Sequence, residues 1–113
     1  MPATLKIDFV SDVSCPWCAI GLHALEQAAE RLAGQVQLDW HFQPFELNPN
    51  MGPEGQDIGE HLQQKYGASA EQREATRAAI AARGAELGFT FTAGARGRIY
   101  NTFDAHRLLH WAE

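Results

Sequence analysis

Two cysteines three positions apart are the residues of this sequence best suited to carry out chemistry. Cys15 and Cys18 are the only cysteines among the 113 residues, and they enclose Pro16 and Trp17. A disulfide between such close residues closes a minimal loop, so it would stabilise a fold very little by restricting the unfolded chain. A pair at this spacing is more often catalytic or metal-binding than structural. The sequence therefore indicates either thiol–disulfide exchange or half of a zinc site.

Exchange chemistry is the interpretation that the rest of the sequence favours. A structural zinc site takes four ligands, and no second cysteine pair is present to supply two of them. His23 and His41 could complete such a site only by an accident of folding. A chance pair of buried cysteines is the third explanation, because free cysteines are often buried. We expect a redox pair, with no metal and no cofactor.

The two cysteines are expected to differ in reactivity because they differ in position. Cys15 would lie at the start of a helix, where free N–H groups and the helix dipole favour a thiolate and lower the thiol pKa. Cys18 would lie one turn deeper on the same face, within disulfide distance, with a pKa nearer its ordinary value. We expect Cys15 to be the nucleophile and Cys18 the resolving thiol. Pro16 would fix the first turn, and Trp17 would present an apolar surface to a bound partner.

A strand before this pair and a helix and a second strand after it are predicted to hold it in place. Apolar and polar residues alternate over about 4–10, which is the period of a strand. Apolar residues then recur at helical spacing from the second cysteine to Leu32, and Gly34 is a candidate to end that helix. A second alternating run over 35–43 is closed by Pro44. Strand, helix and strand in this order predict a parallel βαβ unit.

The remainder of the chain is predicted to be mainly helical. A loop rich in Asn, Pro and Gly over 48–56 is followed by two capping signals, at Asp57 and at Ser69, which predict helices over about 58–66 and 70–87.

The last part of the chain combines an irregular segment with one more helix. The residues over 89–97 resemble an irregular connection, and Thr102 is a candidate to cap a helix that ends at about Trp111.

Charge and hydropathy exclude several kinds of partner. Fourteen acidic residues against nine basic ones give a net charge of −5. Without a basic run, the chain has no electrostatic footprint for nucleic acid or an anionic membrane. No apolar run approaches the roughly 20 residues that span a bilayer. Met1–Ser14 does not have the pattern of an export signal. We expect a cytoplasmic protein with no nucleic-acid or membrane partner.

Three blocks of sequence resemble the FrnE-type, DsbA-like oxidoreductases of the thioredoxin fold. They read DVSCPWCAIG at 12–21, QPFELNP at 43–49 and NTFDAHRL at 101–108. The resemblance implies an α/β, thioredoxin-like fold in which residues 1–48 form the N-terminal βαβ part and residues 49–113 form an all-helical insertion. It also implies a partner that is a disulfide- or thiol-containing protein or small molecule.

The same resemblance places three further residues, Asn101, Thr102 and His106, on a helix that borders the active-site groove. The residues themselves allow a plainer explanation. Thr102 would then be a helix cap, and His106 and His110, four positions apart, would be ordinary residues of a helix surface.

The resemblance also implies C-terminal elements without a counterpart in this sequence: two further strands, a final helix and a cis-proline loop that faces the dithiol. Two parallel strands with one helix leave sheet edges unpaired and one face uncovered. We expect that the chain is a fragment of a longer protein, or that it completes its sheet by pairing with a second copy as a homodimer.

Two other functions stay open beside a thiol–disulfide oxidoreductase. Kappa-class glutathione transferases and chromene-carboxylate isomerases share the implied fold, but they usually carry serine where Cys15 stands. The presence of both cysteines therefore argues against a glutathione-dependent isomerase or transferase. An inactive, truncated module is the other alternative, because the proline loop that helps to bind substrate has no counterpart here.

Overall fold

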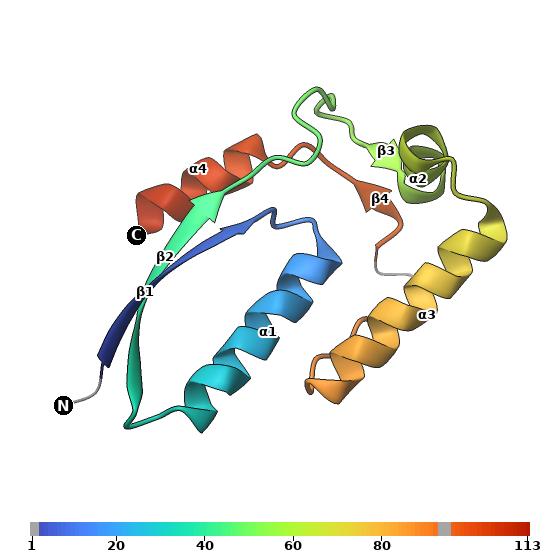
Figure 1. Cartoon of the computed structure of the whole chain (residues 1–113). Coiled ribbons are helices and arrows are strands. Elements are labelled where there is room, and N and C mark those ends of the chain that lie inside the picture. Colours follow the sequence, from blue (N-terminus) through green and yellow to red (C-terminus); the bar gives the residue numbers. More distant parts are fainter. Residues whose placement is uncertain (1–2, 93–95) are drawn as a thin grey trace.

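The described residues of the computed structural model, 3–92 and 96–113, form four helices and four strands (Figure 1). The elements follow one another along the chain as β1 (Ala3–Ser11), α1 (Pro16–Arg31), β2 (Val36–Pro44), β3 (Gln56–Asp57), α2 (Ile58–Tyr66), α3 (Ala70–Glu86), β4 (Arg98–Ile99) and α4 (Phe103–Ala112). The α/β class predicted from the sequence is therefore confirmed.

The N-terminal part is the predicted parallel βαβ unit. β1 and β2 pair in parallel from Ala3 opposite Val36 to Ser11 opposite Pro44. α1 crosses between them and lies along one side of this two-stranded sheet (Figure 1). The helix ends at Arg31, earlier than predicted, and the candidate Gly34 lies in the turn that leads to β2.

The two middle helices begin at the predicted caps. The carboxylate of Asp57 accepts a hydrogen bond from the Glu60 N–H at 3.1 Å and begins α2. At the start of α3, Ser69 and Gln72 exchange both hydrogen bonds of a capping box. These side chains satisfy N–H groups that a helix start leaves without an intrahelical partner.

α3 lies along α1 (Figure 1). Gln27 on α1 donates a hydrogen bond of 3.0 Å to the Leu87 carbonyl at the end of α3, which ties the helical segment to the βαβ unit.

A short antiparallel ladder between β3 and β4 was not predicted. Gln56 pairs with Ile99 and Asp57 with Arg98. The first strand lies at the end of the predicted loop, and the second follows the predicted irregular connection. Strands of two residues carry no period that a sequence pattern could detect. The ladder brings the two ends of the helical segment together. Residues 93–95 of the predicted irregular connection lie outside the described residues.

The final helix, α4, begins at the predicted place but through a different contact. The predicted side-chain cap at Thr102 is wrong, because its hydroxyl makes no capping hydrogen bond. Asn101 supplies it instead, accepting from the Phe103 N–H at 2.9 Å. The amide group of Asn101 also donates to the Met51 carbonyl at 3.0 Å. Asn101 thus links the start of α4 to the loop after β2.

Few apolar side chains of the described residues are buried. Ile20 on α1 and Ile99 on β4 are buried, whereas Trp111 on α4 is 83% exposed. Among polar residues, Asp12, His61, Thr102 and His106 are buried. Within the ranges described, no helix is both long and apolar enough to cross a membrane.

A glycine in α3 provides a test of how closely the chain packs there. A methyl group on Gly84 would lie 2.7 Å from the Phe91 ring and 2.8 Å from the Phe89 carbonyl oxygen. Alanine normally stabilises a helix interior relative to glycine by about 0.5–1 kcal/mol. We predict that Gly84→Ala instead lowers the free energy of unfolding by about 1–3 kcal/mol, because a backbone atom cannot easily give way. Urea denaturation measures this change.

Gly21 in α1 is the matched control. A methyl group there would lie 4.0 Å from the Phe9 ring, an ordinary contact. Gly21→Ala should raise the free energy of unfolding by up to about 1 kcal/mol. If Gly84→Ala were as stabilising as Gly21→Ala, the close packing of residues 89–91 on α3 would be wrong.

Candidate active site

The dithiol lies at the start of α1. Cys15 is the N-cap residue and has an extended backbone, with φ −92° and ψ 114°, and Pro16 is the first helical residue. The Cys15 N–H donates to the Asp12 carbonyl at 3.0 Å. Because proline has no N–H, the free donors at this helix end are the amides of Trp17 and Cys18. The first turn holds no acidic side chain, so this positive end of the helix is open to an anion on Cys15.

The two thiols are neighbours with different environments. Both are free and half-buried, and the Cys18 thiol interacts with the Cys15 side chain. Burial raises the pKa of Cys18 above its usual 9.0, and contact with Cys15 and the charge of Asp12 act in the same direction, against a backbone hydrogen bond from Asp12. The pKa of Cys18 is therefore higher than the sequence led us to expect. Cys18 is a protonated thiol at neutral pH.

Two apolar side chains close to the thiols are exposed. Trp17 is 48% exposed and Val13 is 51% exposed. Pro16, which directly follows Cys15, is half-buried. A partner that approaches Cys15 would therefore meet an indole ring and an aliphatic side chain.

A buried carboxylate lies in the loop that leads into the dithiol. The side chain of Asp12 is 1% exposed. It accepts hydrogen bonds from the Leu47 N–H at 2.9 Å, the Ser14 N–H at 3.4 Å, His106 Nε2 at 3.2 Å and the Thr102 hydroxyl. Burial alone would raise the pKa of Asp12, but these hydrogen bonds outweigh it and the pKa falls below the usual 3.8. Since an ionised carboxylate only accepts, His106 Nε2 carries the hydrogen.

The structure separates the three residues that the sequence resemblance grouped on one helix. Thr102 and His106 are buried, and both contact Asp12. The explanation of His106 as a helix-surface residue is therefore wrong, although it holds for His110, which is exposed. Asn101 is turned towards the loop after β2. A part for these residues in a substrate groove remains a prediction.

Two residues beside the dithiol were not singled out from the sequence. Asp12 occupies the turn directly before the cysteines, and this position was the signal that could have identified it. Arg96 carries no such signal. It donates a hydrogen bond of 3.1 Å from Nη2 to the carbonyl of Ser14, 82 residues earlier in the chain. Burial lowers the pKa of Arg96, and the nearby Cys15 charge opposes that change.

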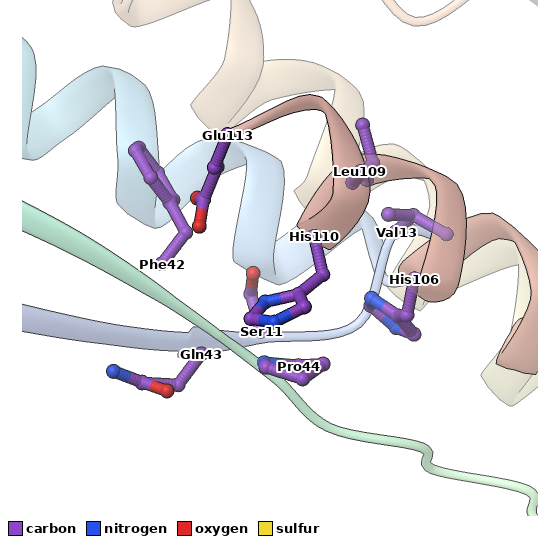
Figure 2. Close-up of a pocket in the computed structure, with 9 residues that line it drawn as sticks. All are labelled: Ser11, Val13, Phe42, Gln43, Pro44, His106, Leu109, His110 and Glu113. Atoms are coloured by element: carbon purple, nitrogen blue, oxygen red, sulfur yellow. The ribbon is translucent and has the colours of Figure 1, made fainter.

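A hollow of about 270 Å³ lies next to this site, between the C-terminal end of β2 and α4 (Figure 2). Its lining is mainly apolar, and His106 and His110 project into it from α4 towards Ser11 and Pro44 (Figure 2). Neither cysteine lines it. The hollow is therefore a neighbour of the dithiol and not the place where exchange would occur.

In the part of the chain that the structure describes, no three His, Cys, Asp or Glu side chains gather in a way that could hold a metal ion.

Comparisons with known proteins agree on one family. The model of the DSBA-like thioredoxin domain matches residues 6–113. Comparison with curated proteins gave no significant match. The crystal structure of a probable DsbA oxidoreductase, SCO1869 from Streptomyces coelicolor, is similar with a TM-score of 0.85 and 32% sequence identity. The similarity covers 95% of this chain and 46% of that one, so this chain spans less than half the length of that protein. With this fold and a family model that matches nearly the whole sequence, the chain belongs to the family of DSBA-like thioredoxin domains.

Proposed function

We propose that this protein is a thiol–disulfide oxidoreductase with Cys15 as nucleophile and Cys18 as resolving thiol. The observation that carries the proposal is the contact between the two thiols at the open end of α1. Membership of the DSBA-like family and the similarity to a probable DsbA oxidoreductase support this general class of activity. The FrnE-type assignment is a finer proposal, which rests on the three sequence blocks around residues 12–21, 43–49 and 101–108.

The reaction would proceed by two successive displacements. The Cys15 thiolate attacks one sulfur of a partner disulfide, a new sulfur–sulfur bond forms, and the second partner sulfur leaves as a thiolate that takes a proton from water. The Cys18 thiol then loses its proton to water and attacks the Cys15 sulfur of this mixed disulfide. The bond between Cys15 and the partner breaks, and the first partner sulfur leaves as a thiolate that takes a proton from water. The partner is reduced by two electrons, and the protein is left with a Cys15–Cys18 disulfide. Reversal of both steps would oxidise a partner dithiol.

The raised pKa of Cys18 suits the order of these steps. A protonated Cys18 does not compete for the partner disulfide, because the thiolate is the attacking species. Contact with Cys15, including its charge, is among the causes that raise the pKa of Cys18. Once Cys15 is bonded to a partner sulfur its charge disappears, and so does part of that effect. The resolving thiol therefore becomes easier to deprotonate when it is needed.

The partner is proposed to be a protein or a small molecule that carries a disulfide or a dithiol. Trp17 and Val13 offer it an exposed apolar contact beside Cys15. Aromatic side chains provide a large apolar contact area with few rotatable bonds, which favours their use in binding partners.

Asp12, Thr102 and His106 are proposed to position the dithiol rather than to react. The backbone carbonyl of Asp12 accepts a hydrogen bond from the Cys15 N–H and so holds the loop that leads to Cys15. The carboxylate of Asp12 links that loop to α4 through His106. The Asp12 hydrogen bonds favour the ionised form, so the carboxylate contributes stability above its ordinary pKa of 3.8. This contribution is lost as the pH falls through the lower value that Asp12 has in the folded protein.

Exchange of each cysteine for serine tests the proposed reaction. We predict that Cys15→Ser reduces insulin no faster than the uncatalysed reaction with dithiothreitol, because a hydroxyl does not replace a thiolate as nucleophile. Cys18→Ser should also lose turnover but should still form the first mixed disulfide. After incubation with oxidised glutathione, intact mass spectrometry should find one glutathione adduct on Cys18→Ser and none on Cys15→Ser. Activity of Cys15→Ser equal to that of the parent would disprove the assignment.

Acid unfolding tests the ionised state of Asp12. We predict that Asp12→Asn lowers the free energy of unfolding at pH 7 by about 1–3 kcal/mol, because hydrogen bonds to a charged acceptor are lost. The difference from the parent should shrink as the pH falls from about 5 to below 3, where the parent carboxylate becomes neutral too. Urea denaturation at several pH values measures it.

Asp104→Asn is the control for this series, because the Asp104 side chain on α4 is 89% exposed. It should change stability by less than about 0.5 kcal/mol at any pH in this range. A difference between Asp12→Asn and the parent that did not depend on pH would rule out the buried anion.

A further inference from the structure

A cation from a distant part of the chain lies beside the nucleophile. Arg96, in the segment before β4, donates from Nη2 to the carbonyl of Ser14 at 3.1 Å. That carbonyl belongs to the same peptide group as the N–H of Cys15, which donates to the Asp12 carbonyl at 3.0 Å. The peptide group before Cys15 is therefore held at both its ends, by Arg96 on one side and by Asp12 on the other.

The charges around Cys15 have opposite effects on it. The titratable groups that interact with it are Cys18 on α1 and Arg96, while the charge of Asp12 in the preceding loop acts on Cys18, and His106 on α4 hydrogen-bonds Asp12. A carboxylate opposes a second negative charge nearby, as the Asp12 charge does at Cys18. A guanidinium group is always protonated and has the opposite effect. The charge of Arg96 and that of a Cys15 thiolate attract each other.

We propose that Arg96 is a positioning residue of the dithiol, which holds the Ser14–Cys15 peptide group and favours the anionic form of Cys15. This inference deepens the proposed function and rests on it for its biological meaning. It can nevertheless be tested without turnover, because a thiolate is detected by its own reactivity.

Loss of the Arg96 charge has a consequence that depends on pH. Deprotonation of Cys15 transfers its proton to water and leaves an anion that the guanidinium group stabilises. Without that group the anion is less stable, so fewer thiolates exist at low pH. The remaining thiolate is more basic and therefore a better nucleophile, since the reactivity of thiolates rises with pKa with a Brønsted coefficient of about 0.4–0.5. Reaction should thus be slower at low pH and faster at high pH.

The experiment measures alkylation of Cys15 by iodoacetamide from about pH 4 to pH 10, a range that covers thiol pKa values at such positions. Both proteins carry Cys18→Ala, so that one thiol reacts. We expect Arg96→Gln to react about threefold more slowly than the parent at the acid end of this range and about threefold faster at the alkaline end. Damage to the fold would not produce two rate profiles that cross.

Two further substitutions serve as controls. Arg96→Lys keeps the charge and should restore most of the shift. Arg98→Gln removes an equal charge two residues away, from a side chain that donates to the Glu54 carbonyl at 2.9 and 3.1 Å. It should leave the Cys15 profile unchanged. An unmoved profile in Arg96→Gln, or an equal shift in Arg98→Gln, would overturn the proposal.

Ionic strength provides a second measurement that needs no folded Arg96 variant. Salt screens exposed charge pairs, so raising the ionic strength from about 0.01 M to about 1 M should move the alkylation profile of the protein that keeps Arg96 in the same direction as Arg96→Gln does. An alkylation profile that does not respond to salt would contradict the proposal. If the rate profiles shift but insulin is not reduced, the proposed function fails and the role of Arg96 stands. If insulin is reduced but the rate profiles do not shift, the proposed function stands and the role of Arg96 fails.

Discussion

The buried carboxylate of Asp12 is the interaction on which the arrangement of this site depends. Burying an ion is costly unless hydrogen bonds replace its water. Here the replacement comes from its own loop, from Leu47 after β2, from Thr102 just before α4 and from His106 on α4. This polar cluster thus joins α4 to the loops that follow β1 and β2, where few apolar side chains among the described residues are buried. The backbone carbonyl of Asp12 also accepts a hydrogen bond from the Cys15 N–H.

The asymmetry of the two thiols follows from this arrangement and not from the cysteines alone. Cys15 lies at the open end of a helix with Arg96 nearby, whereas Cys18 is half-buried, and burial, contact with Cys15 and the charge of Asp12 raise the pKa of Cys18. Identical side chains three residues apart thus have different environments. Cys18 is kept as a neutral thiol, which suits the resolving step of sequential exchange.

Local patterns were enough to predict most elements but not the contacts that complete the site. The strands of the βαβ unit and the helices after it follow from periodicity and from caps such as Ser69, because these depend on residues close in sequence. The β3–β4 ladder and the contact of Arg96 with Ser14 join segments more than 40 residues apart, and no local pattern encodes them. The burial of His106 could not be predicted for the same reason, since it depends on a contact with Asp12, 94 residues away. The FrnE type and a cytoplasmic location remain predictions.

The β3–β4 ladder has a consequence for how this domain can vary. Because β3 and β4 pair with each other, the chain enters and leaves the helical segment at one two-residue pairing, while α3 also contacts α1. Lengthening a loop whose ends are already fixed costs little additional entropy. Evolution could therefore extend, shorten or replace α2 and α3 while the geometry of the dithiol is preserved. Arg96 lies just before that junction, so such changes would leave it in place.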